Sequence, residues 1–338
     1  QSVQACSPCK QYNYSRQKKP GHLQPIPPSP IPFSVIGMDF CGPFVESSRG
    51  NKYILVITDL FTRFVTAIPL PNNAAELTAL TLFRHVFCHY GICSTLTMDQ
   101  GTHFNNRLMQ ALQHLLGYNH ILSSPYHPQT NAVVERFNAS MVVQVSKLQQ
   151  KHHNNWDDYL DAIVFAYNTS KHKTTRYSPF ELLFGRSPRL PIDPPPQYLQ
   201  VERPNDYFIH LQKILQVYHQ QAKANILEHQ RYNKQRYDRN RRDPHYNLGD
   251  RVFTKIFAAR GKLDPRYSID PKIIVQVNHP TYVVRHEASG IERRYHVSDL
   301  RPVTMDYDDG SRNISALLSA KPINNINFRL VSTSKSKP

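Results

Sequence analysis

The feature that most restricts the fold is a series of short β-branched segments that one helix-like segment interrupts between residues 33 and 98. The helix-like segment "AAELTALTLFRHVFCHY" carries Leu77, Leu80, Phe83 and Phe87 at helical spacing, and it ends at Gly91, a residue type common at helix C-termini. Three antiparallel strands, a helix and a fourth strand form an α/β arrangement. The predicted strands are "FSVIGMDF", "KYILVIT", "RFVTAIPL" and "STLTMD".

The alternation of helices and strands continues to about residue 190. A helix in "NNRLMQALQHLLG" ends at Gly117, and the strand "NHILSS" and the proline-containing loop "PYHPQT" follow it. The next helix runs from about Ala132 to Gln150, because its apolar residues fall on one stripe. A helix in "WDDYLDAIVFAYN" completes the region, so we predict one α/β domain over residues 28–190.

Proline-rich stretches mark the predicted boundaries on both sides of this domain. Residues 1–27 form a short N-terminal piece that ends in a proline-rich connector, and "PRLPIDPPPQYL" ends the central domain. Residues 191–245 are predicted as a proline-rich linker and a basic helix, and short, regularly spaced strands over 246–303 predict a small β-barrel. Residues 304–338 lack periodicity and are rich in Ser, Asn and Lys, which predicts a disordered tail.

The net charge of +16 is distributed unevenly along the chain. Residues 1–30 carry +4, residues 31–160 are neutral, and residues 161–338 carry +12. Basic flanks around a neutral centre favour a polyanion that is held on both sides of a reaction site. Scattered surface lysines on a basic protein are the alternative. For the run "RYNKQRYDRNRR", a solvated helix face and a DNA contact fit about equally well.

The sequence also indicates a cellular compartment. No uninterrupted apolar run of about 18 residues occurs, and the first residues lack the order of a secretion signal, so we predict an intracellular protein without a membrane partner. The chain has five cysteines, an odd number that favours reduced thiols over a disulfide framework.

Two carboxylates interrupt apolar strand segments, Asp39 in "VIGMDFCG" and Asp99 in "LTMDQG". Removing an ionised carboxylate from water is costly unless it is hydrogen-bonded, paired or bound to a metal. Glu135 follows Asp99 with 35 residues between them and opens a helix. If the two strands are adjacent and that helix crosses them, three oxygen ligands converge, which suits Mg²⁺. The alternative is two strand-end caps and a first-turn glutamate, and Asp59 is predicted as a turn residue.

Three segments resemble the signature segments of retroviral and Gypsy-type long-terminal-repeat retrotransposon integrases: "SVIGMDFCGPF", "LTMDQGTHFNN" and "SPYHPQTNAVVERFN". The resemblance continues through "AYNTSKHKTTRYSPFELLFGR" and covers roughly residues 5–303. It implies a ribonuclease-H-like core with a mixed five-stranded sheet and flanking helices, then a helical linker and a small SH3-like β-barrel. It also maps Asp39, Asp99 and Glu135 onto catalytic carboxylates that bind two Mg²⁺ or Mn²⁺ ions.

The same resemblance implies DNA-binding residues. Some fall in a loop that contacts the DNA end, others directly follow the glutamate, and the rest lie in the basic run after the core. These residues are Tyr126, His127 and Gln129, then Arg136 and Asn138, and Arg236, Arg239, Arg241 and Arg242.

The chain departs from the family pattern at three places. Ala132 stands where the family often has Gly, and "SIDPKII" stands where a Gly-Pro-Tyr or Gly-Pro-Phe signature is usual. Cys6 and Cys9 in "CSPC" resemble the second half of a His-His-Cys-Cys zinc site, but no His pair precedes them. Because a closed zinc site needs four ligands, we expect Zn²⁺ here only if a His pair is supplied. Residues 1–27 are therefore interpreted as a remnant of a zinc-binding module.

The resemblance implies DNA integration: 3′-end processing of double-stranded element DNA and strand transfer into target DNA, in the nucleus. Because two DNA ends need two active sites, we expect a homo-oligomer, a dimer or a tetramer. A domesticated, catalytically inactive DNA-binding protein is the main alternative. A ribonuclease-H-type nuclease shares the metal chemistry, but the "PYHPQ" loop and the predicted barrel disfavour it.

Overall fold

The computed structural model describes residues 7–13, 18–29, 31–99, 101, 104, 106–122, 132–149, 154–190, 192–194, 204–257 and 263–303. The chain forms two compact units, one from Leu23 to Arg239 and one that combines Gln1–His22 with Asn240–Pro338. The predicted tail, residues 304–338, lies outside the described residues. The domain boundaries drawn at the prolines stay predictions.

The larger unit contains a mixed five-stranded sheet with the strand order β3-β2-β1-β4-β5. β1 pairs antiparallel with β2, and β2 pairs antiparallel with β3, whereas β1, β4 and β5 run parallel. This topology confirms the predicted α/β arrangement. The strands are β1 (Val35–Cys41), β2 (Tyr53–Asp59), β3 (Val65–Leu70), β4 (Thr95–Met98) and β5 (Asn119–Leu122).

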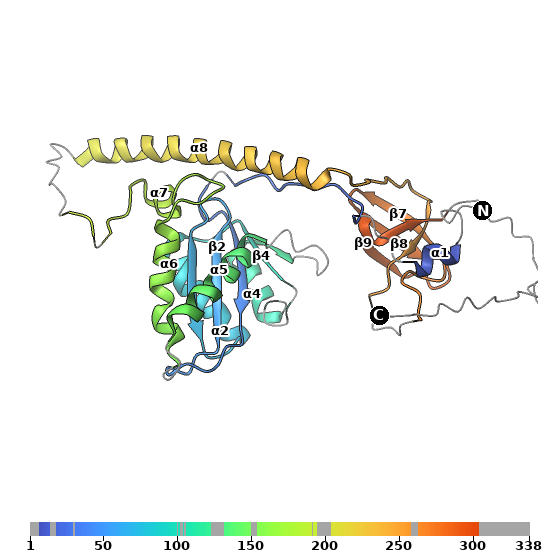
Figure 1. Cartoon of the computed structure of the whole chain (residues 1–338), viewed down its shortest axis with the longest axis horizontal. Helices are drawn as coiled ribbons and strands as arrows, with labels where there is room; N and C mark the ends of the chain where they lie inside the picture. The colour runs from blue at the N-terminus through green and yellow to red at the C-terminus, as the bar shows by residue number, and fades with distance from the viewer. Residues whose placement is uncertain are drawn as a thin grey trace, which may run out of the picture. The chain divides into compact units, whose positions relative to one another are not determined.

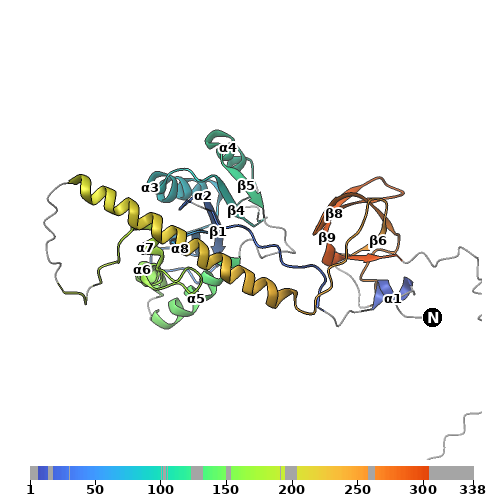
Figure 2. The same ribbon diagram turned by 90° about the horizontal axis from the view of Figure 1, so that it is seen from above.

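Helices cover both faces of this sheet (Figure 2). Side chains alternate along β2, so Ile54 and Val56 join the core under one helical layer and Leu55 and Ile57 join the other. The first layer consists of α5 (Ala132–Leu148) and α6 (Leu160–Thr169). A 3₁₀ turn at Trp156–Tyr159 leads directly into α6. The second contains α2 (Ala75–Leu82) and α4 (Arg107–Leu116). The result is a three-layer α/β/α unit.

The helix predicted between β3 and β4 is interrupted. After α2 the chain makes a π-helical turn at Phe83–Phe87, and α3 (Cys88–Tyr90) follows it. A π turn holds more residues than an α turn and therefore rotates the buried face. The predicted apolar stripe is wrong in part, because Leu80 and Phe83 are exposed while Leu82 and Val86 are buried.

Two further helices complete the larger unit, α7 (Pro179–Phe184) and the 35-residue α8 (Pro204–Asp238). α8 confirms the helix predicted after Asn205, and its His219 ring donates to the carbonyl of Leu182 on α7 at 2.7 Å. Gly185 ends α7 with φ of 67°, and a Cβ there would lie 2.6 Å from Cδ1 of Leu211 on α8. Among the described helices, none combines the length and apolar character that crossing a membrane requires.

The smaller unit contains a five-stranded antiparallel sheet with the order β10-β6-β7-β8-β9 (Figure 1). The regularly spaced strands predicted from the sequence are therefore confirmed, and they enclose a core that includes Ile274, Tyr282 and Val297. The short helix α1 (Ser7–Tyr12) packs against this sheet, since Lys10 donates to the carbonyl of Pro302 at 2.9 Å. The strands are β6 (Arg251–Thr254), β7 (Lys272–Asn278), β8 (Thr281–His286), β9 (Glu292–His296) and β10 (Leu300–Pro302).

Candidate active site

Asp39 lies on β1, on the face of the sheet that α5 covers. Ile36 and Met38 belong to the core on the opposite face, so Asp39, which alternates with them, faces α5. Its Oδ1 accepts a hydrogen bond from the backbone N–H of Phe40 at 2.9 Å. Its Oδ2 accepts one from the side-chain amide of Asn138 on α5, also at 2.9 Å. Both carboxylate oxygens of Asp39 are therefore held in place by neighbours.

Asp99 immediately follows β4, the parallel neighbour of β1. The two strands pair Val35 with Thr95 and Gly37 with Thr97, and the same register continued by two residues places Asp99 opposite Asp39. Oδ1 of Asp99 accepts from the backbone N–H of Gly101 at 2.9 Å, which fixes the turn after the strand. The parallel pairing thus brings the two aspartates to one edge of the sheet.

Glu135 reaches the same place from the first turn of α5. Val134 and Phe137, its neighbours on that helix, are buried in the core beneath α5, whereas the Glu135 side chain is exposed. The apolar stripe therefore positions the helix, and Glu135 lies at the solvent-facing margin of the stripe.

The electrostatics of Asp39 show that the three carboxylates interact. The pKa of Asp39 is raised to about 6, mainly by burial and then by the charges of Asp99 and Glu135, against the hydrogen bonds from Phe40 and Asn138. Like charges that converge in this way favour binding of a cation. The donors are carboxylate oxygens, the type that Mg²⁺ and Mn²⁺ prefer, so the residues present fit a divalent metal site.

Asn138 takes a position that its predicted DNA contact does not explain. Its side chain is 8% exposed, and its amide donates to Asp39. The amide oxygen Oδ1 is buried and makes no hydrogen bond within the described structure. This arrangement favours a role in positioning Asp39 over a direct contact with DNA.

The structure brings together only part of the other predicted site residues. Arg136 is exposed on α5 next to Glu135. Tyr126, His127, Gln129 and Cys6 lie outside the described residues. Among the described cysteines, Cys41, Cys88 and Cys93 are free thiols.

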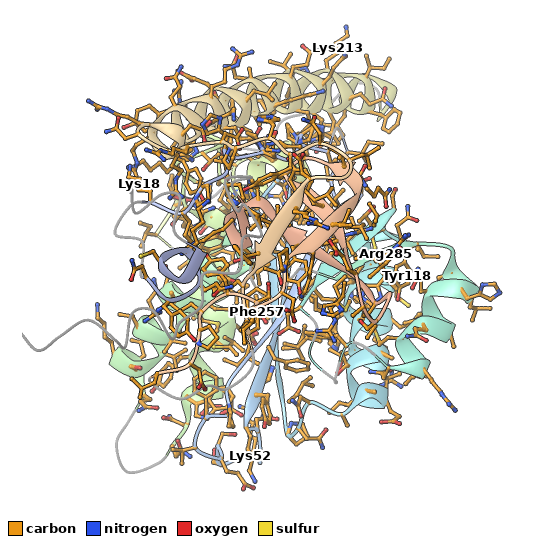
Figure 3. The ribbon with its side chains drawn as sticks, turned by 90° about the vertical axis from the view of Figure 1, so that its right-hand side faces the viewer. Lys18, Lys52, Tyr118, Lys213, Phe257 and Arg285 are labelled. Atoms are coloured by element: carbon orange, nitrogen blue, oxygen red, sulfur yellow. The ribbon has the colours of Figure 1, made fainter. Side chains whose placement is uncertain are left out.

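The predicted basic run crosses from α8 into the smaller unit. Arg236, Arg239 and Arg242 are exposed, and Arg241 donates from Nη1 to the carbonyl of Lys19 at 2.5 Å. Lys213, earlier on α8, projects away from the body of the larger unit (Figure 3). Exposed cations of this kind can meet a polyanion, and a solvated helix face remains compatible with the same geometry.

A pair of basic side chains near α5, Arg63 and His172, was not predicted from the sequence. Arg63 is 8% exposed, and its burial lowers the pKa of the guanidinium to about 10. His172 is half-buried, and burial together with the charges of Arg63 and Arg136 lowers its pKa to about 4. Arg63 lies in a turn and His172 between helices, so no periodic pattern could have brought them together.

Asp59 behaves as the sequence predicted. Its carboxylate accepts from the backbone N–H of Phe61 at 3.3 Å and from that of Thr62 at 2.9 Å, and it also accepts from the Thr62 hydroxyl at 2.6 Å. Asp59 is therefore a turn residue at the end of β2, and these hydrogen bonds partly oppose the burial that raises the pKa of its carboxyl group.

Comparison with known proteins agrees with this geometry. Residues 29–128, which hold both aspartates, match the family model described as "Integrase core domain". The retrovirus-related Pol polyprotein from transposon 412 of Drosophila melanogaster is 28% identical over 249 residues, 71% of this chain and 20% of that protein. The transposon Tf2-3 polyprotein of Schizosaccharomyces pombe is 33% identical over 196 residues, 57% of this chain and 15% of that protein. The chain thus spans a fifth or less of these relatives.

A solved structure shows the same fold over most of the chain. The chain in the cryo-EM structure of the simian T-cell lymphotropic virus intasome in complex with PP2A regulatory subunit B56 gamma superposes with a TM-score of 0.59. It is 17% identical and the match covers 90% of this chain and 89% of that one, so the likeness concerns the fold alone. The family match thus covers the five-stranded sheet of the larger unit, and both relatives are transposon polyproteins.

Proposed function

We propose that this chain is the integrase of a Gypsy-type element, which processes the 3′ ends of linear element DNA and joins them to target DNA. The observation that carries the proposal is the convergence of Asp39, Asp99 and Glu135, in which two charges raise the pKa of the third carboxyl group. Within a ribonuclease-H-like core, this set of carboxylates suits phosphodiester chemistry.

Asp39, Asp99 and Glu135 would hold two divalent ions, Mg²⁺ or Mn²⁺. When bound, such ions activate the attacking oxygen and stabilise the leaving oxygen of a phosphodiester. The chain's own contribution is orientation, because Phe40 and Asn138 hold the two oxygens of Asp39. Phosphoryl transfer depends mostly on positioning and charge stabilisation, so these contacts contribute by holding Asp39 in place.

The reaction proceeds in two steps at one site. Water cleaves near the end of the element strand and leaves a 3′ hydroxyl, and that hydroxyl then attacks a phosphodiester of the target. Each step breaks one P–O bond of a phosphodiester and forms one P–O bond to the attacking oxygen. Neither ATP nor a covalent enzyme intermediate is therefore required. Carboxylates that hold a metal ion are ionised. Their negative charge beside the attacking oxygen favours loss of its proton.

The remaining parts of the proposal concern DNA and assembly. The exposed Arg236, Arg239 and Arg242, with Arg136 beside the carboxylates, supply cations for double-stranded DNA. The five-stranded antiparallel sheet of the smaller unit serves as an SH3-like DNA-binding barrel. The protein acts as a homo-oligomer in the nucleus, and Cys6 and Cys9 bind Zn²⁺ only where a His pair completes the site.

A strand-transfer assay with the full chain, a labelled blunt duplex, target plasmid and Mg²⁺ tests the proposal. We expect labelled joined products that chelation abolishes. Duplex binding without joining would favour the inactive DNA-binding alternative. Cleavage of the RNA strand of a hybrid without joining would favour the nuclease. Either of those outcomes would overturn the assignment as an integrase.

A further inference from the structure

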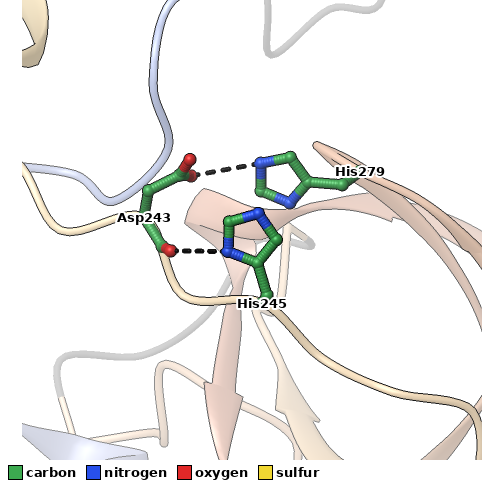
Figure 4. Close-up of side chains that lie close together, drawn as sticks. All are labelled: Asp243, His245 and His279. Carbon is green, nitrogen blue, oxygen red and sulfur yellow. Dashed lines mark hydrogen bonds and ion pairs between the residues drawn. The ribbon is translucent and has the colours of Figure 1, made fainter.

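A second group of metal-ligating side chains lies in the smaller unit. Asp243 and His245 lie between α8 and β6, and His279 lies in the turn between β7 and β8 (Figure 4). One ligand atom of each residue lies within 4.8 Å of the others. The two imidazole rings stack with centroids 4.1 Å apart and planes 13° from parallel. Two segments 34 or more residues apart in the sequence thus bring two imidazoles and a carboxylate together.

The hydrogen bonds of the two rings leave a nitrogen of each available. Nδ1 of His245 lies 3.0 Å from the main-chain carbonyl of Asp243. A carbonyl oxygen only accepts, so this nitrogen carries the proton and, in the neutral ring, Nε2 carries the lone pair. Nδ1 of His279 lies 2.9 Å from the Tyr282 hydroxyl. The backbone N–H of Tyr246 donates to that same hydroxyl, which helps to fix it in position.

His279 presents a buried nitrogen that faces the carboxylate of Asp243. Nε2 is buried and has no hydrogen bond to any described residue, although Oδ1 of Asp243 lies 3.2 Å away. In a tetrahedral zinc site with metal–ligand bonds near 2.1 Å, ligand atoms lie about 3.4 Å apart. The Asp243–His279 pair already has about this spacing, and a ligand atom of the exposed His245 lies within 4.8 Å of both.

The carboxylate of Asp243 is itself held by the N-terminal segment. Nδ1 of His22 lies 3.2 Å from Oδ2, and the backbone N–H of His22 donates to Oδ1 at 3.3 Å. A ligating carboxylate or imidazole in proteins is commonly oriented by such an outer partner. Pro244 also restricts the backbone between the two ligands that it separates, which limits their freedom before binding.

We propose that Asp243, His245 and His279 bind a transition-metal ion of the zinc class, with His22 orienting the carboxylate. Imidazole and carboxylate together suit Zn²⁺ and Co²⁺, and three protein ligands leave one position for water. The ion would join the segment at residues 241–245 to the β7–β8 turn. It would also hold the N-terminal segment through His22. The site is separate from Asp39, Asp99 and Glu135, whose oxygen-only set suits Mg²⁺.

Co²⁺ titration of the full chain, followed by its visible absorption and by competition with Zn²⁺, tests the site. Two other places could bind these ions, so the parent protein carries Cys6→Ser and Cys9→Ser, and excess Mg²⁺ occupies the carboxylates. We expect the parent to bind one Co²⁺ that Zn²⁺ displaces. His245→Gln and Asp243→Asn should each weaken binding at least about tenfold, and His22→Gln should weaken it about tenfold.

His286→Gln, which removes a histidine of β8 outside the group, is the matched control and should bind Co²⁺ like the parent. His279→Gln is judged only if its circular dichroism matches the parent's. The exposed His245 provides the variant that cannot disturb the core. Absence of Co²⁺ binding by the parent would overturn the proposal. Equal affinity of the parent, His245→Gln and Asp243→Asn would also overturn it.

Discussion

Replacing Asp39 by Asn should stabilise the metal-free protein while it removes a catalytic carboxylate. The pKa of Asp39 is raised from 3.8 to about 6, mainly by burial and then by the charge of Asp99. At about 1.4 kcal/mol per pKa unit, the ionised form costs at most roughly 3 kcal/mol. Because the side chain is only half-buried, solvent screening reduces this, and we expect about 1–2 kcal/mol.

The sign of the effect depends on pH. A carboxyl group whose pKa is higher in the folded than in the unfolded state destabilises the fold only where it is ionised. Wild type and Asp39→Asn should be about equally stable below pH 4, provided that Asn138 turns its amide so that its Oδ1, which has no hydrogen bond within the described structure, accepts from the new amide group. The variant should gain its full advantage above pH 6. Thermal unfolding in chelator from pH 4 to 8 measures this, and the variant's melting temperature should be a few degrees higher at neutral pH.

With Mg²⁺ present, wild type should have the higher melting temperature. Mg²⁺ neutralises Asp39 in the wild type but binds more weakly to the variant. Asp59→Asn is the comparison variant, because burial also raises the pKa of Asp59 but hydrogen bonds to its carboxylate oppose that rise. Its carboxylate accepts from Phe61 and Thr62, and an amide would place N–H groups against these donors. That variant should therefore lose about 1–3 kcal/mol of stability. A lower melting temperature for Asp39→Asn in chelator, at every pH, would refute the electrostatic reasoning.

Three other predictions follow from single contacts. Asn138→Ala removes the amide that holds Asp39, so Mg²⁺ affinity by calorimetry should fall about 10–100-fold, whereas Ser146→Ala on the same helix should not change it. Because the pKa of His172 is lowered to about 4, its protonation opposes folding. Wild type should therefore lose up to about 3 kcal/mol relative to His172→Asn between pH 6.5 and 4, and a pH-independent difference in denaturant unfolding would contradict this. Gly185→Ala should lower the free energy of unfolding by about 1–3 kcal/mol, because its Cβ would press on Leu211 at a positive φ; unchanged stability would show that α8 can move away.

The sequence predicted the strands and most helices because each carries a local period. Alternation along "KYILVIT" and the apolar stripe of α5 are visible without tertiary information. The register between β1 and β4 is not, since it depends on non-local pairing. The sequence therefore predicted that the three carboxylates converge only if the two strands are adjacent. The pairing of Val35 with Thr95 shows that they are.

Other features were not predicted, because no periodic pattern in the sequence indicates them. The π turn at Phe83–Phe87 moves the buried face within an otherwise helical pattern. α7 has a capping box at Ser178 and Glu181, a local signal that could have been used. Asn138 was placed among DNA contacts because it follows Glu135 in sequence, whereas its orientation on α5 directs it to Asp39.

The most direct test of the integrase assignment compares strand transfer by wild type, Asp99→Asn and Glu135→Gln with DNA binding measured in parallel. Glu76→Gln is the control, since Glu76 is also an exposed first-turn glutamate, on α2. We predict that both site variants bind the duplex with near wild-type affinity and form no joined product, and that Glu76→Gln retains wild-type joining. Joining at the wild-type rate by Asp99→Asn or Glu135→Gln would contradict the proposed active site.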